Sequence, residues 1–195
     1  MPEVRFETRL SLTVEQIWAF VQDMNNWAPM LTGYQKHEII DDRHSIWTLK
    51  GDVGILSRTV VLDVQIIEWS GPHRVAFTLT GKNESVEGGG LFEMQSEVAG
   101  AAPETPVAVA PRPGLFGRLL RWVFGALFRR QFGKVERLDV AIAEGVGSRL
   151  CFTLRMDAGG PTGPLVNALL EPALLPAAED LGSKIAAHLE ALHRG

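Results

Sequence analysis

The longest hydrophobic pattern in the chain lies at its C-terminal end, between Gly163 and His193. Apolar side chains recur there at steps of three and four, which places them on one face of an α-helix. Pro172 and Pro176 lie inside this pattern, and because proline removes a backbone donor we expect a bend or a broken first segment there. A face this broad needs a large apolar partner surface, which the preceding strands must supply. The predicted stripe consists of Val166, Leu170, Leu174, Ala178, Leu181, Ile185, Leu189 and Leu192, widened by Leu165, Leu169 and Ala173.

Alternation of apolar and polar residues predicts a series of strands before that helix. Val4 to Leu12 alternates in this way, and Thr13 follows with Gln16 three residues later, which is the capping-box pattern of a helix start. Trp27 to Leu31 has the composition of a second short helical turn. Because the later strands follow one another through short connections, they form an antiparallel sheet. These predicted strands span residues 34–40, 45–50, 55–69, 74–81, 91–98 and 149–157.

The glycine run from Gly88 to Gly90 invites comparison with a phosphate-binding loop. No Lys-Ser or Lys-Thr pair follows it, and no helix is predicted to start there, so we reject that interpretation. Glycines just before a strand more often allow a sharp bend or bulge in a curved sheet.

Composition narrows the class of protein but identifies no reaction. The 195 residues have a net charge of -4, which argues against a nucleic-acid binder. Cys151 is the only cysteine, so an internal disulfide is impossible, as is common in reducing compartments. The charged N-terminus is not a signal peptide, and no uncharged apolar run reaches the ~18 residues of a membrane span. The five histidines lack metal-ligand spacing, so we expect no bound metal. The sequence identifies no catalytic residues, because it offers no Cys-His or Ser-His-Asp arrangement, and we expect no cofactor.

The order of strand, two short helices, strands and long helix resembles the helix-grip fold of the START-like (SRPBCC) superfamily. It is most similar to the CoxG branch, whose members accompany carbon monoxide dehydrogenase. The resemblance implies an α+β fold, a single domain over residues 1–195 in which a curved antiparallel sheet wraps around the C-terminal helix and encloses an apolar cavity. The matching stretches are VEQIWAFVQDMNNWAPMLTGY, VEGGGLFEM and GSRLCFTLRMDAGGPTGPLVNALL.

We expect a hydrophobic ligand, lipid- or quinone-like, in this cavity. Arg58 shares a face with Val60 and Leu62 by period two, so it either meets a polar ligand group or is exposed at the end of its strand. Cys151 alternates onto the face opposite Phe152 and should point away from the cavity. The predicted lining is Trp27, Met30, Trp47, Arg58, Phe77, Phe92, Met94, Phe152 and Leu174.

Residues 99–134 interrupt the strand pattern as an insertion. Its first part is rich in Ala and Pro and is typical of an extended linker. Its second part, residues 115–134, contains basic and large apolar side chains but no acidic one, which is typical of an amphipathic helix at a membrane surface. We expect membrane contact by Leu115, Phe116, Arg118, Leu119, Arg121, Trp122, Phe124, Phe128, Arg129 and Arg130.

The leading interpretation is therefore a cytoplasmic, ligand-binding protein without enzymatic activity. We expect its insertion to attach it to anionic lipids on the inner face of the membrane. The CoxG resemblance implies a link to a molybdenum hydroxylase system of the carbon monoxide dehydrogenase type. Two alternatives stay open: an assembly factor whose insertion docks on an oxidoreductase, and a cyclase or hydrolase of the same superfamily.

Overall fold

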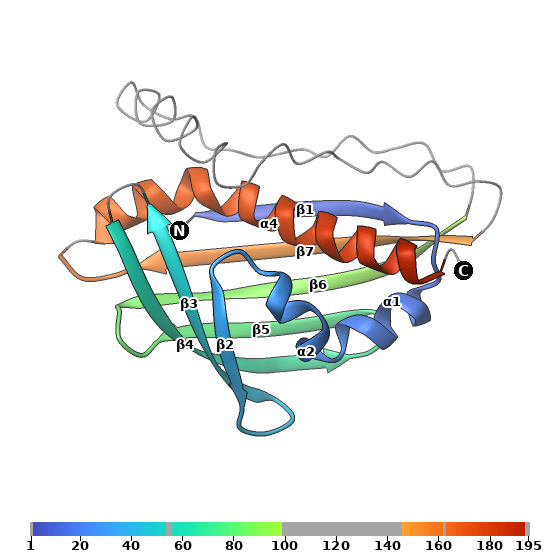
Figure 1. Ribbon diagram of the computed structural model, residues 1–195, viewed down its shortest axis with the longest axis horizontal. Coiled ribbons are helices and arrows are strands. Elements are labelled where there is room, and N and C mark those ends of the chain that lie inside the picture. Colours follow the sequence, from blue (N-terminus) through green and yellow to red (C-terminus); the bar gives the residue numbers. More distant parts are fainter. Residues whose placement is uncertain (1, 54–55, 99–145, 162, 194–195) are drawn as a thin grey trace.

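The described part of the protein folds as a seven-stranded antiparallel sheet with helices on one face (Figure 1). This computed structural model describes residues 2–53, 56–98, 146–161 and 163–193. In sequence order the described elements are β1 (Glu3–Leu10), α1 (Val14–Val21), α2 (Met24–Trp27), the 3-10 turn η1 (Ala28–Met30), β2 (Tyr34–Ile39), β3 (His44–Val53), β4 (Leu56–Ser70), β5 (Arg74–Gly81), β6 (Val86–Val98), β7 (Val146–Ala158) and α4 (Gly163–His193).

The sheet has the strand order β1-β7-β6-β5-β4-β3-β2. From β2 to β7, each strand pairs with the next one in the sequence. The first strand, β1, pairs with the last, β7, in an unbroken register from Glu3 opposite Arg155 to Leu10 opposite Ser148. Register shifts interrupt the β2–β3 pair after Tyr34 and the β4–β5 pair after Ile66. Such bulges increase twist and bend a sheet, which suits a surface that curves around helices.

The C-terminal helix α4 lies over β1 and β7, and α1 and α2 cover the same face of the sheet beside it (Figure 1). Its buried positions follow the predicted spacing: Leu174, Ala178, Leu181, Ile185 and Leu189 are each at most 6% exposed. This row forms the core with side chains of β1, α1, β6 and β7.

Three features of the predicted helix and sheet need correction. The helix α4 is continuous through Pro172 and Pro176, so the alternative of a broken first segment is wrong. Leu165 and Leu192, placed on the buried stripe, are 62% and 59% exposed. The run Gly88 to Gly90 lies inside β6, paired on both sides with β5 and β7, and not before a strand.

Polar contacts fix both ends of α4. Near its start, the Asn167 side chain accepts a hydrogen bond from the Ala158 backbone N–H at 2.7 Å and donates to the Asp157 carboxylate at 2.9 Å. Near its end, the buried Glu190 carboxylate accepts from the Ser11 backbone N–H at 2.9 Å and from the Ser11 hydroxyl at 2.8 Å. The helix is therefore anchored to the end of β7 and to the segment between β1 and α1.

Candidate functional site: an aromatic-lined cavity

An apolar cavity of about 180 Å³ lies between the concave face of the sheet, the α1–α2 segment and α4. Strands β3 to β7 supply most of its wall, and Ala177, Ala178 and Leu181 of α4 supply one side. The remaining described lining residues are Val21, Gln22, Met24, Trp27, Leu31, Trp47, Leu49, Leu62, Val64, Ile66, Trp69, Val75, Phe77, Leu79, Phe92, Phe152, Leu154 and Met156.

Aromatic rings form a continuous row through this lining. Phe92 lies at its centre, with ring centroids 4.6 Å from Phe152, 5.7 Å from Trp27 and 6.1 Å from Phe77. Trp47 continues the row at 5.5 Å from Trp27. Tilted and edge-on rings at these separations attract one another beyond their area burial. The row forms a continuous apolar surface in the cavity wall.

The hydrogen-bond donors of the two innermost tryptophans are already used within the protein. Trp27 donates its indole N–H to the Val21 carbonyl at 3.0 Å, and Trp47 donates to the Ser45 hydroxyl at 2.8 Å. Gln22, an exposed residue, is the one side chain with an amide or a charge among the described lining residues. A buried ligand group that requires hydrogen bonds would lose them here, so the cavity favours apolar groups.

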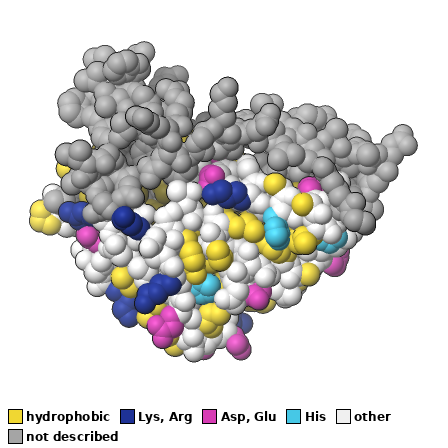
Figure 2. All heavy atoms as spheres, viewed as in Figure 1, with side chains coloured by type: hydrophobic (Ala, Val, Ile, Leu, Met, Phe, Trp, Pro, Cys, Tyr) yellow, Lys and Arg dark blue, Asp and Glu magenta, His cyan; other side chains and the backbone are white. Residues whose placement is uncertain are grey.

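The α1–α2 segment covers the cavity because several contacts fix it in place. Thr13 and Gln16 form the predicted capping box at the start of α1, with hydrogen bonds of 3.3 and 2.9 Å. At the other end, Lys184 of α4 donates to the Met30 carbonyl at 3.2 Å and to Asp180 at 2.6 Å. Thr32 donates to the same Asp180 carboxylate at 2.7 Å. Hydrophobic side chains gather on this face around α1 and the α2–η1 segment (Figure 2).

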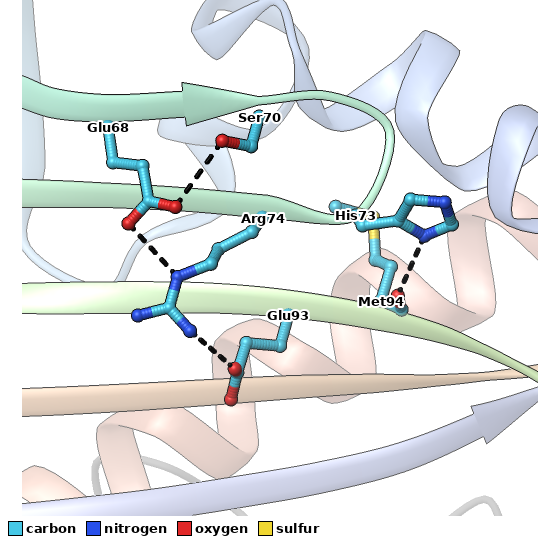
Figure 3. A network of polar contacts seen from close by, with 6 residues as sticks. All are labelled: Glu68, Ser70, His73, Arg74, Glu93 and Met94. Carbon is cyan, nitrogen blue, oxygen red and sulfur yellow. Dashed lines mark hydrogen bonds and ion pairs between the residues drawn. The ribbon is translucent and has the colours of Figure 1, made fainter.

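The opposite face of the sheet carries polar side chains. Arg74 of β5 donates to Glu68 of β4 and to Glu93 of β6, both at 3.0 Å (Figure 3). His73 accompanies them in the β4–β5 turn, where its ring lies 3.3 Å from the Met94 carbonyl oxygen. Because side chains alternate along each strand, these charges lie across the sheet from the cavity. Charge and apolar surface are thus separated onto two faces.

Among the described residues, two side chains have displaced pKa values, and neither lines the cavity. Burial raises the pKa of the Cys151 thiol, an effect that the nearby Arg5 partly offsets. Hydrogen bonds from the backbone at the start of α1 and from Thr13 lower the pKa of Glu15. Within the part of the chain that the structure describes, no three His, Cys, Asp or Glu side chains are grouped to hold a metal ion.

The structure brings five of the nine predicted lining residues to the cavity, namely Trp27, Trp47, Phe77, Phe92 and Phe152. Met30, Met94 and Leu174 pack in the adjacent core without lining the cavity. Arg58 is 60% exposed and pairs with Glu84 at 3.0 Å, as expected for the strand-end alternative. Period two on β4 marks Leu62, Val64 and Ile66. Steps of three and four from Val14 through Ile17 and Trp18 mark Val21 on one face of α1. Met24 and Leu31 lie in or next to helical turns that are too short to show a period.

All ten residues predicted to contact a membrane, from Leu115 to Arg130, lie outside the described residues, as does the rest of the insertion 99–134. Among the described helices, none is long and apolar enough to cross a membrane.

Comparison with known proteins agrees with this geometry. A protein-family model matches residues 1–101, more than half of the chain, and the chain belongs to the family that this model describes. No curated protein matches the sequence. A START superfamily protein from Mycobacterium smegmatis is similar in structure, with a TM-score of 0.52, 13% identity and coverage of 97% of this chain and 98% of that one. This chain has a START-like fold.

Other neighbours in structure have equally low sequence identity. A conserved protein from Geobacillus kaustophilus has a TM-score of 0.57 and 13% identity, with coverage of 97% of this chain and 95% of that one. A protein from Thermus thermophilus has a TM-score of 0.56 and 14% identity, with coverage of 98% of this chain and 99% of that one. Identities this low establish the fold alone, and the CoxG branch stays a prediction.

Proposed function

We propose that this START-like protein binds a hydrophobic small molecule, lipid- or quinone-like, in the cavity. The observation that carries the proposal is an apolar, aromatic-lined cavity in which the indole donors of Trp27 and Trp47 are already bonded within the protein. The lining offers no pair of titratable side chains among the described residues, which favours binding over turnover by a cyclase or hydrolase.

The size of the cavity sets what it holds. Its 180 Å³ is comparable to an engineered cavity of about 150 Å³ that binds benzene, and smaller than the ~300 Å³ of a usual ligand pocket. A ring system fits inside, and a longer ligand extends past Gln22 at the surface. Removing about 200 Å² of apolar surface from water contributes about 5 kcal/mol, from which the cost of the ligand's lost translational and rotational freedom is subtracted. A ligand with more apolar surface binds more tightly.

Two substitutions of alanine by phenylalanine on α4 test this site. Ala178 lines the cavity and is 3% exposed, whereas Ala187 on the same helix is exposed. The probe is N-phenyl-1-naphthylamine, whose fluorescence rises in apolar surroundings. We expect Ala178→Phe to weaken binding at least tenfold because the new ring fills the cavity, and Ala187→Phe to bind as the wild type does. Equal binding by both variants would place the probe elsewhere and contradict the proposal.

The natural ligand is identified by native mass spectrometry of the protein purified from a bacterial host, followed by organic extraction. A co-purifying lipid or quinone that is absent from the Ala178→Phe variant supports the proposal. A bound species retained equally by that variant argues against this cavity as its site.

We also propose peripheral membrane attachment through residues 115–134, in support of an oxidoreductase of the molybdenum hydroxylase type. The support is the sequence, in which Arg118, Arg121, Arg129 and Arg130 accompany large apolar side chains with no acidic residue. Each basic residue near an anionic leaflet contributes about 1 kcal/mol. Deleting residues 99–134 should abolish co-flotation with vesicles that contain anionic lipid. Unchanged flotation refutes attachment, and capture of an oxidoreductase without lipid favours the assembly-factor alternative.

A further inference from the structure

Phe77 and Gly90 face each other across the strands β5 and β6 in the wall of the cavity. Phe77 lines the cavity, and its ring is one of the three that neighbour Phe92, the others being Trp27 and Phe152. Gly90 is on the same face of the sheet, two residues before Phe92. The pair therefore lies where a change in one side chain alters the space available to a ligand.

Only the absence of a side chain at Gly90 allows the Phe77 ring to lie where it does. A Cβ atom at Gly90 would be 2.7 Å from Cε1 and 3.0 Å from Cε2 of Phe77, and closer still to Cζ. These separations are shorter than carbon atoms tolerate, so the ring occupies the volume that any other residue at position 90 would fill. Phe77 thus lies against the wall.

The neighbouring glycines differ from Gly90 in what they approach. A Cβ at Gly88 would overlap the backbone carbonyl of Arg155, and one at Gly89 would be 2.7 Å from the backbone carbonyl oxygen of Phe77. Substitution at either position requires the sheet itself to move. At Gly90 the nearest atoms belong to the far end of one side chain, which can rotate. Since the strands of the sheet lie on the other side, the room for that rotation is the cavity.

We infer that Gly90 determines the size of the ligand that the cavity accepts, because it leaves room against β6 for the end of the Phe77 ring. The inference rests on the proposed binding function of the same cavity. A side chain at position 90 pushes the Phe77 ring inward and reduces a space of only about 180 Å³. This predicts which class of ligand binds. The cavity accepts an apolar ring system larger than one benzene ring when position 90 is glycine, and rejects it when position 90 is alanine.

The test compares a small and a large probe, benzene and N-phenyl-1-naphthylamine, by isothermal titration calorimetry. In Gly90→Ala we expect at least tenfold weaker binding of the large probe and less than threefold change for benzene. The matched control is Gly51→Ala in β3, where a Cβ would meet no atom within 4 Å, and it should bind both probes as the wild type does.

Phe77→Leu supplies the second arm, because a smaller side chain needs less room beside position 90. The double variant Phe77→Leu/Gly90→Ala should recover binding of the large probe to within threefold of Phe77→Leu alone. A Gly90→Ala protein that binds the large probe like the wild type overturns the inference and leaves the binding function standing. A double variant that stays defective also overturns it, because the loss then does not act through Phe77. A wild-type protein that binds neither probe overturns both proposals.

Discussion

Two leucines three residues apart on α4 provide a direct test of how the helix is stabilised. Leu189 is 1% exposed and packs in the main core, whereas Leu192 is 59% exposed. Truncating a buried leucine to alanine removes its transfer free energy and leaves a cavity, at a total cost of about 2–5 kcal/mol. We expect Leu189→Ala to lower the free energy of unfolding by about that amount. The exposed Leu192→Ala should change it by less than about 0.5 kcal/mol.

Urea unfolding followed by tryptophan fluorescence measures both variants, because the midpoint shifts at constant slope when only stability changes. In a thermal scan the same loss lowers Tm by roughly 4–20 °C for Leu189→Ala, at about 2–4 °C per kcal/mol for a domain of this size. Leucine and alanine have similar helix propensities, so the two substitutions differ mainly in burial. Similar losses in the two variants would refute the assignment of the buried face, and with it the core position of α4.

Three further predictions concern caps, buried contacts and the lone thiol. Thr13→Ala should lower the unfolding free energy by about 0.5–2 kcal/mol through loss of the α1 cap, with Thr13→Ser retaining most of it in the same melt. Glu190→Ala should lower the free energy of unfolding by about 2–4 kcal/mol, because it leaves the Ser11 backbone N–H without its acceptor. A loss below about 0.5 kcal/mol would contradict a stabilising role for this hydrogen bond. Cys151 is 4% exposed and should resist alkylation by iodoacetamide until the protein unfolds. Burial raises the pKa of the Cys151 thiol in the folded protein, so the thiol of the unfolded chain ionises first as pH rises. The free energy of unfolding should therefore fall as pH rises above about 8.5. Cys151→Ala should remove this contribution to the dependence of stability on pH.

Much of the fold follows from periodicity. Alternation locates β5 at Arg74–Gly81 as the structure has it, and spacing of three and four locates α4 at Gly163–His193. The start of β6 is missed because three glycines have low strand propensity, and pairing with both neighbouring strands overrides that local preference. Local sequence carries no information about pairing of that kind.

The cavity is less predictable than the fold. The aromatic residues Trp47, Phe77 and Phe152 are expected at the cavity because large side chains alternate onto one face. Met94 alternates onto the same face and is 1% exposed, but it packs in the core beside the cavity. Which inward residue meets empty space and which meets a neighbour depends on where α4 and α1 lie on the curved sheet. Periodicity fixes a face, whereas tertiary packing decides the position along it.

The register of β6 and β7 has a consequence for how this domain can be altered. Val98, the last residue of β6, lies opposite Val146, the first residue of β7. Directly opposed residues in an antiparallel pair have Cα atoms about 4.5–5.5 Å apart, a distance that a two-residue turn can join. Residues 99–145 are therefore attached at two neighbouring points of one hairpin. A segment joined in this way is an exchangeable module, which evolution or an engineer can shorten, lengthen or replace while the strands on either side keep their partners.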